Sequence, residues 1–190
     1  MIQTDSHVIT SSKPRSGDTE FQSLVALLDD PDMRIATAVE DRLRIRGASI
    51  LTPLLDFIDI SPDALAKERA GVLAKELNEK ILLEGFASLR EKIVEKKRGT
   101  LEEGTFLIAR FGHPRIDVEY YKAELDALAG MLRDRIVGIH SPIDVLTATN
   151  EFFFKTRGFK GNHDNFLDPD NSYMNQVIDR KLGIPISLSV

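Results

Sequence analysis

Apolar residues recur at helical spacing along most of the chain. In the segment after residue 18, Phe21, Leu24, Val25 and Leu28 stand at positions i, i+3, i+4 and i+7, which gives a helix one apolar face. Similar spacing predicts helices over residues 31–47, 48–60, 61–98, 101–111, 118–137, 143–158 and 173–182. No stretch alternates apolar and polar residues as a half-buried strand does. The pattern therefore predicts a mainly α chain, built as a helical bundle.

Capping residues refine the ends of two of these helices. Thr100 and Glu103 have the spacing of a capping box, in which each side chain bonds a backbone N–H at the start of a helix. Asn171 or Ser172 is suited to cap the helix of residues 173–182, and Gly183 to end it. We therefore expect these five residues to mark helix termini.

The chain is expected to divide into four segments. Residues 1–18 are rich in Ser, Thr, Lys and Pro and have little to bury, so they are predicted to form a flexible leader. Residues 19–60 form a first helical module, residues 61–98 connecting helices, and residues 99–190 the beginning of a second domain.

The first module has a resemblance of its own. The segment "LVALLDDPDMRIATAVEDRLRIRGASILTPLLDFI" resembles a HEAT-type helical repeat. Only one such unit is visible, and a solenoid needs about three stacked repeats. We therefore expect a HEAT-like module that docks on the rest of the chain, and repeats of this type imply contacts with other proteins.

Composition excludes several classes of function. A net charge of −5 argues against a nucleic-acid binder, which needs a basic face. The absence of cysteine excludes disulfides, thiolate metal sites and a cysteine nucleophile. No run approaches the roughly 20 apolar residues of a membrane span, and the N-terminus lacks an apolar signal core. We therefore expect a cytoplasmic protein whose partner is another protein, with neither nucleic acid nor membrane as a partner.

The segment "GFKGNHDNFLDPDNS" is the richest in functional groups. Its Asn, Asp and Ser side chains are of the kind that hydrogen-bond nearby backbone groups in turns, and we take it as the candidate functional loop. The candidate residues are Asn162, His163, Asp164, Asp168, Asn171 and Ser172.

Three chemical interpretations of this region were compared with a purely structural loop. A calcium loop would use Asp168, Asp170, Ser172 and Asp179, but Tyr173 stands where such a loop needs glycine. A metal site of His163, Asp164 and Asp168 lacks a regular spacing, and a nucleophile at Ser187 or Ser189 has no nearby histidine base. A loop that satisfies its own backbone is favoured, so no metal and no cofactor are expected.

A longer pattern resembles a known family. The segment "NEFFFKTRGFKGNHDNFLDPDNSYMNQVIDRKLGIPISLSV" resembles the transglutaminase-like core of the SirB-type family, and the likeness extends upstream through "LEEGTFLIARFGHPRIDVEYYKAELDALAGML". With the HEAT-like start it covers about Thr19 to Val190. The most specific elements are Gly161-Asn162, Asp168-Pro169, Asn171-Ser172 and the run from Gly183 to Ile186.

The resemblance implies both a fold and an altered site. Members have a papain-like transglutaminase fold with a cysteine nucleophile at the start of a central helix, in a Gly-x-Cys motif. Here Gly183-Ile184-Pro185 falls on that motif, so Pro185 stands at the nucleophile position, with Ser187 and Ser189 nearby. The resemblance therefore implies the helical front half of that fold, which becomes α+β if the native chain continues past Val190 into the sheet.

Two functions follow as expectations. The first is a non-catalytic transglutaminase-like protein that acts as a protein-binding or scaffold module. The alternative is a papain-like hydrolase or acyl-transferase whose catalytic residues lie beyond Val190. If the sheet is missing, the C-terminal apolar residues are expected to be exposed and to favour self-association; these are Ile184, Ile186, Leu188 and Val190.

Overall fold

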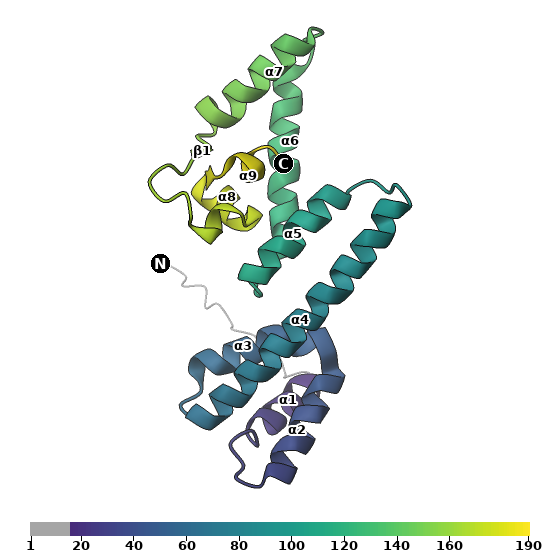
Figure 1. The fold of residues 1–190 in the computed structure, drawn as a ribbon, viewed down its shortest axis with the longest axis vertical. Helices are drawn as coiled ribbons and strands as arrows, with labels where there is room; N and C mark the ends of the chain where they lie inside the picture. The colour runs from purple at the N-terminus through teal and green to yellow at the C-terminus, as the bar shows by residue number, and fades with distance from the viewer. Residues whose placement is uncertain (1–15) are drawn as a thin grey trace, which may run out of the picture. The chain divides into compact units, whose positions relative to one another are not determined.

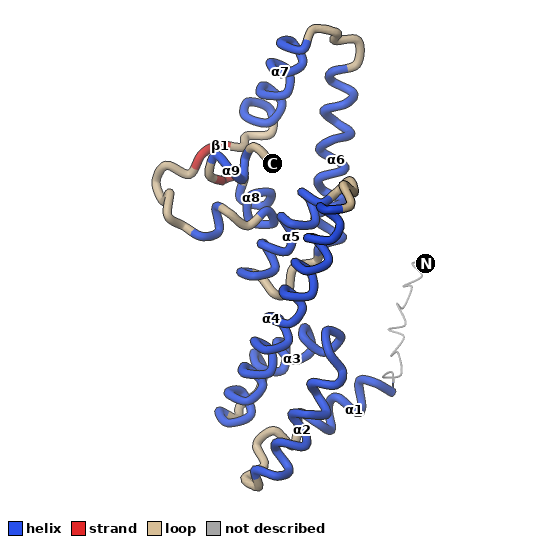
Figure 2. Tube along the Cα trace, turned by 45° about the vertical axis from the view of Figure 1, so that its right-hand side comes forward, coloured by secondary structure: helices blue, strands red, loops and turns tan. Residues whose placement is uncertain are grey.

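The computed structural model describes the backbone of residues 16–190 and the side chains from Thr19 onward, and this part of the chain is mainly helical, as predicted (Figures 1 and 2). Its α-helices are α1 Ser16–Val25, α2 Met33–Arg46, α3 Leu51–Ile60, α4 Ala64–Val94, α5 Thr100–Gly112, α6 Val118–Ile136, α7 Pro142–Asn150, α8 Met174–Arg180 and α9 Pro185–Leu188. Shorter elements are the 3-10 turns η1 Gly47–Ile50 and η3 Pro169–Asn171, the π-helical segment η2 Glu151–Thr156, and the strands β1 Lys160–Gly161 and β2 Leu182–Gly183.

The chain forms two compact units that meet after Leu77, within α4. Residues 1–15 of the predicted leader lie outside the described residues, and residues 16–18 belong to the first turn of α1. The predicted division into residues 19–60, 61–98 and 99–190 is finer than this, and its inner boundaries stay predictions.

The first unit, which ends at Leu77, contains α1, α2, α3 and the first part of α4. Helices α2, α3 and α4 and the turn after α1 each contribute a leucine with essentially no exposed surface. Arg69 on α4 closes that turn by donating to the carbonyl oxygens of Leu28 and Asp30, at 2.7 and 3.0 Å. The fully buried leucines are Leu28, Leu43, Leu54 and Leu73.

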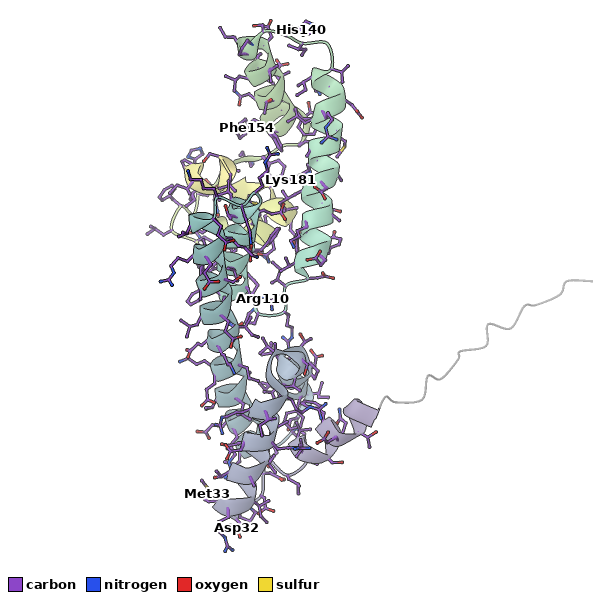
Figure 3. The ribbon with its side chains drawn as sticks, turned by 90° about the vertical axis from the view of Figure 1, so that its right-hand side faces the viewer. Asp32, Met33, Arg110, His140, Phe154 and Lys181 are labelled. Carbon is purple, nitrogen blue, oxygen red and sulfur yellow. The ribbon has the colours of Figure 1, made fainter. Side chains whose placement is uncertain are left out.

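Helix α2 shows how local sequence sets the helix ends. Asp32 is its N-cap and accepts a hydrogen bond from the backbone N–H of Arg34, 2.9 Å away. Figure 3 labels Asp32 and Met33 at this end of the helix. The helix stops at Gly47, whose φ of 62° is costly for other residues.

Both predictions of capping side chains in the second unit are wrong. Helix α5 starts after Gly99, at a φ of 79° and with no side-chain cap, because Glu103 instead binds the Lys92 ammonium group on α4 at 2.7 and 2.8 Å. At α8, neither Asn171 nor Ser172 caps the helix: the N-cap is Tyr173, which makes no side-chain bond. The helix ends at Lys181, which adopts a φ of 55°, and not at Gly183.

The second unit, residues 78–190, has its own apolar core. It joins α5, α6, η2 and α8 through buried residues that include Phe106, Leu128, Phe152 and Val177. Helices α6 and α7 run antiparallel (Figure 1), and Figure 3 labels His140 at the turn between them. On α6, Leu128 is buried, and Tyr121, Leu125 and Leu132 pack partly buried against the same core.

A short parallel strand pair was not predicted. Lys160 pairs with Leu182, and Gly161 pairs with Gly183. Two residues per strand are too few for apolar and polar positions to alternate, so the sequence carries no local sign of them. The pair sets the position of the candidate loop, which leaves from the end of β1.

Candidate functional site

The β1–β2 pair brings together the two sets of candidate residues that the sequence indicated separately. The Asn162 backbone N–H donates to the carbonyl oxygen of Gly183, with 3.0 Å between the atoms. The start of the Asn162–Ser172 loop therefore lies beside the Gly183–Ser189 segment. Figure 2 shows the loop in tan between β1 and α8.

Two buried amides hold the loop in shape. The Asn162 Nδ2 group donates to Asn171 Oδ1 at 2.9 Å, and Asn162 Oδ1 accepts from the Asn165 N–H at 3.1 Å. The Asn171 Nδ2 group donates to the carbonyl oxygens of Asn165 and Phe166, at 2.8 and 3.3 Å. Asn171 has no exposed surface and Asn162 only 8%, so the bond between the two amides forms out of contact with water, and together the four bonds define one loop conformation.

Asp168 forms the turn in the second half of the loop. Its Oδ1 accepts the Asp170 N–H at 3.0 Å and so caps η3. The Arg180 guanidinium donates to Asp168 Oδ2 at 2.7 Å and lies 3.4 Å from Asn171 Oδ1. The hydrogen bond from the Asp170 backbone, together with Arg180, holds the pKa of the Asp168 carboxyl below its usual value.

His113 connects this turn to the end of α5. Its Nε2 lies 3.0 Å from Asp170 Oδ1, and its ring meets the Tyr173 ring edge-on, with 5.2 Å between the centroids. The contact joins residues 57 positions apart in sequence. It fixes η3 against α5.

The remaining candidate loop residues point to solvent. His163, Asp164 and Ser172 are exposed. In the described part of the chain, no three His, Asp or Glu side chains come together in a way that could hold a metal ion. The amide network thus unites Asn162 with Asn171, and Asp168 joins it through Arg180, while the other three candidates stay outside it.

The Ser187 hydroxyl is held by hydrogen bonds to backbone groups. Its side chain is nearly buried, and its Oγ accepts the Ile184 N–H at 3.0 Å and donates to the Asn171 carbonyl oxygen at 2.6 Å. The hydroxyl therefore ties α9 to the loop through backbone groups. Pro185 is the exposed first residue of α9, and the Ser189 hydroxyl donates to the Ile186 carbonyl oxygen at 2.9 Å.

Sequence reasoning missed four residues of this region. Arg180 is the first cation after a loop with several aspartates, and that charge pattern could have indicated it. His113 is remote in sequence and gave no signal. Phe166 and Leu167 were overlooked as apolar residues in a polar loop, yet they stand 59% and 88% exposed.

The C-terminal apolar residues divide into two kinds. Ile186 and Val190 are 74% and 51% exposed, as expected. Ile184 and Leu188 are half-buried, and Leu188 packs against the core of the second unit. Self-association through this segment stays a prediction, and only two of its four apolar residues are exposed to solvent.

Comparison with known proteins finds similarity over part of the chain. Residues 119–190 match the family model of the Transglutaminase-like superfamily. A UPF0162 protein of Xylella fastidiosa strain 9a5c is 37% identical over 112 residues, covering 59% of this chain and 39% of that protein. A UPF0162 protein of Xylella fastidiosa strain Temecula1 / ATCC 700964 is 40% identical over 84 residues, covering 44% and 30%. The matched region thus spans less than half the length of these relatives.

No solved structure matches the chain. Within residues 16–190, no helix combines the length and the apolar character needed to cross a lipid bilayer.

Proposed function

We propose that this chain is a protein-binding module built on a transglutaminase-like segment that has lost its nucleophile. The proposal extends the superfamily match to the SirB-type branch, and it takes residues 19–60 as a HEAT-like second surface for protein contacts. It also assigns the protein to the cytoplasm.

The observation that carries the proposal is the environment of the nucleophile position. Pro185 occupies it under the family resemblance, and proline has no group that can attack a carbonyl carbon. Ser187 is the nearest hydroxyl that is buried, and its bonds go to backbone groups of Ile184 and Asn171. A serine nucleophile needs a base within hydrogen-bonding reach, and these bonds give Ser187 a structural role instead.

The Asn162–Ser172 loop is the proposed contact surface. Its amide network fixes the backbone before any partner arrives, so binding costs little loop ordering. The same network leaves the Phe166 and Leu167 side chains in solvent. Exposed apolar side chains on a preorganised loop are suited to fill a pocket on another protein.

The alternative is acyl transfer or hydrolysis by the whole protein. The superfamily match favours it, and the curated relatives extend well beyond the matched region. In that case the reacting groups come from residues outside this sequence.

Labelling tests whether this chain has a serine nucleophile of its own, and amine incorporation by the whole protein tests the alternative. We expect a serine-reactive fluorophosphonate probe to leave the chain unmodified, and amine incorporation into a glutamine-containing substrate to stay at the uncatalysed rate. Labelling that disappears in Ser187→Ala or Ser189→Ala would contradict the proposal.

Binding is tested in the native cell with a photo-crosslinking amino acid at Leu167. The matched control is Leu146 on α7, which is 64% exposed. We expect one discrete adduct from position 167 alone, with a partner whose binding to the purified chain is lost in Leu167→Glu. Equal adducts from both positions would argue against a role for the loop.

A further inference from the structure

Helix α4 carries an exposed stripe on the side that does not face α5. Its residues in the second unit follow each other at intervals of four, three, four and three, the spacing of a coiled-coil contact line. Leu83, Phe86 and Ile93 are 72%, 43% and 56% exposed, and the polar members are exposed as well. We call this stripe the α4 seam; it consists of Glu79, Leu83, Phe86, Arg90 and Ile93.

The seam is distinct from the face of α4 that packs within the unit. A side chain at Gly85 would collide with Leu107 of α5. Lys92 of α4 binds Glu103, which also lies on α5. Residues seven positions apart lie on the same face of an α-helix, so Gly85 and Lys92 define the α5-facing side. Leu83 and Phe86 lie away from it.

The seam is complementary to itself. The span from Glu79 to Arg90 has its midpoint between Glu84 and Gly85, with Leu83 and Phe86 at equal distances on either side, and Ile93 lies beyond this symmetric span. Glu79 and Arg90 are also equidistant from that midpoint, and they carry opposite charges. Read from its two ends, the span from Glu79 to Arg90 places an acid where the other reading has a base.

We propose that the α4 seam pairs antiparallel with the α4 seam of a second copy of this chain. In that arrangement Leu83 of each copy meets Phe86 of the other, and Arg90 of each meets Glu79 of the other. A two-fold axis forms each contact twice. The inference does not rest on the proposed function, because it concerns a different surface.

The order of the charges along the α4 seam favours a second copy of the chain as the partner, and it favours antiparallel pairing of the two helices. A parallel pair would place Arg90 against Arg90 and Glu79 against Glu79, and like charges across a helix contact are repulsive. Binding to a lipid surface does not account for an acid and a base at equal distances on either side of an apolar centre. Glu79 also interacts within its own chain. Its carboxylate would therefore keep that contact and accept the Arg90 guanidinium of the second copy as a further partner.

The size of the contact sets its strength. Four turns of one helix bury less than the roughly 800 Å² per partner of a standard interface. We therefore expect a dissociation constant on the order of tens of micromolar.

Sedimentation of the full chain from about 1 μM to about 300 μM spans this range. We expect a monomer–dimer equilibrium, and Leu83→Glu should raise its dissociation constant at least about tenfold by placing a charge in the seam. Leu101→Glu is the matched control, since Leu101 is 63% exposed on α5. Ile186→Glu tests the C-terminal segment instead.

The charged pair gives a second, reciprocal test. Arg90→Glu and Glu79→Arg should each weaken the dimer, and the double variant should restore it, with circular dichroism confirming that each variant is folded. A monomer over the whole concentration range would overturn the proposal. So would a dimer that Ile186→Glu dissociates and Leu83→Glu does not, or equal losses with Leu101→Glu.

Spin labels determine the direction of pairing. The chain has no cysteine, so Ala87→Cys and Val94→Cys each give one label per copy. With 1.5 Å of rise per residue, an antiparallel pair separates the two labels by roughly 8 Å along the axis at position 87 and roughly 28 Å at position 94. Equal distances at both positions indicate a parallel pair and contradict the proposal.

Discussion

At the scale of single residues, the loop depends on Asn171. Its amide donates to two carbonyl oxygens of the loop and accepts from Asn162, and Asn171 itself has no exposed surface. Asn171→Ala removes all three hydrogen bonds and leaves the buried Asn162 amide without this partner, which costs about 1–3 kcal/mol for a neutral group. We expect the free energy of unfolding of the second unit to fall by about 2–4 kcal/mol in urea titrations.

The control for this prediction is Asn165→Ala. The Asn165 side chain is exposed, and the loop uses the backbone groups of this residue. Its removal should change the unfolding free energy by less than about 0.5 kcal/mol. Equal effects of the two substitutions would show that the amide network does not hold the loop.

The sequence indicated which residues of the loop matter and not what they do. Asn162 and Asn171 were candidates as side chains that hydrogen-bond nearby backbone groups, and Ser187 as a hydroxyl near the nucleophile position that the family resemblance implies. Their partners follow from the β1–β2 register, which joins Gly161 to Gly183. Twenty-two positions separate the two strands in the chain, so no local pattern contains this register.

At the scale of elements, helical periodicity was a sound guide, whereas the capping residues predicted for α5 and α8 were not. Helix α6 lies at Val118–Ile136, close to the predicted 118–137, because a 3.6-residue apolar repeat is a local property. Helix ends are decided by competition for each side chain. Glu103 went to Lys92 and Asn171 to the loop, so neither was left to cap a helix.

Two helical glycines in the second unit provide a matched comparison. A Cβ added at Gly112, the last residue of α5, would overlap the Tyr173 ring, whereas one at Gly130 within α6 meets nothing within 4 Å. Gly130→Ala should stabilise the unit by about 0.5–1 kcal/mol through helix propensity. Gly112→Ala should destabilise it by about 1–3 kcal/mol, because displacing the ring outweighs that gain.

Urea unfolding followed by circular dichroism checks both signs. If the two substitutions stabilise the unit alike, α5 does not pack against Tyr173 in solution. Both variants make the same chemical change, glycine to alanine within a helix. The difference between their unfolding free energies therefore reports on the contact between Gly112 and Tyr173.

At the scale of the whole molecule, the chain consists of two units with separate cores. The buried cluster around Phe106 and Val177 contains only residues of the second unit, and the leucines around Leu54 belong to the first. Periodicity predicted helices in both units. It could not assign them to two cores, because an apolar face does not specify which other face will cover it.

Separate cores predict separate unfolding. All three tyrosines, Tyr120, Tyr121 and Tyr173, lie in the second unit, and the chain has no tryptophan. Tyrosine fluorescence therefore reports on that unit alone, while far-ultraviolet circular dichroism reports on both. Leu54→Ala, which removes a fully buried side chain, should destabilise the first unit by about 2–5 kcal/mol. We expect an earlier dichroism transition and an unchanged tyrosine midpoint, whereas a tyrosine midpoint that moves with it would mean that the two units unfold as one.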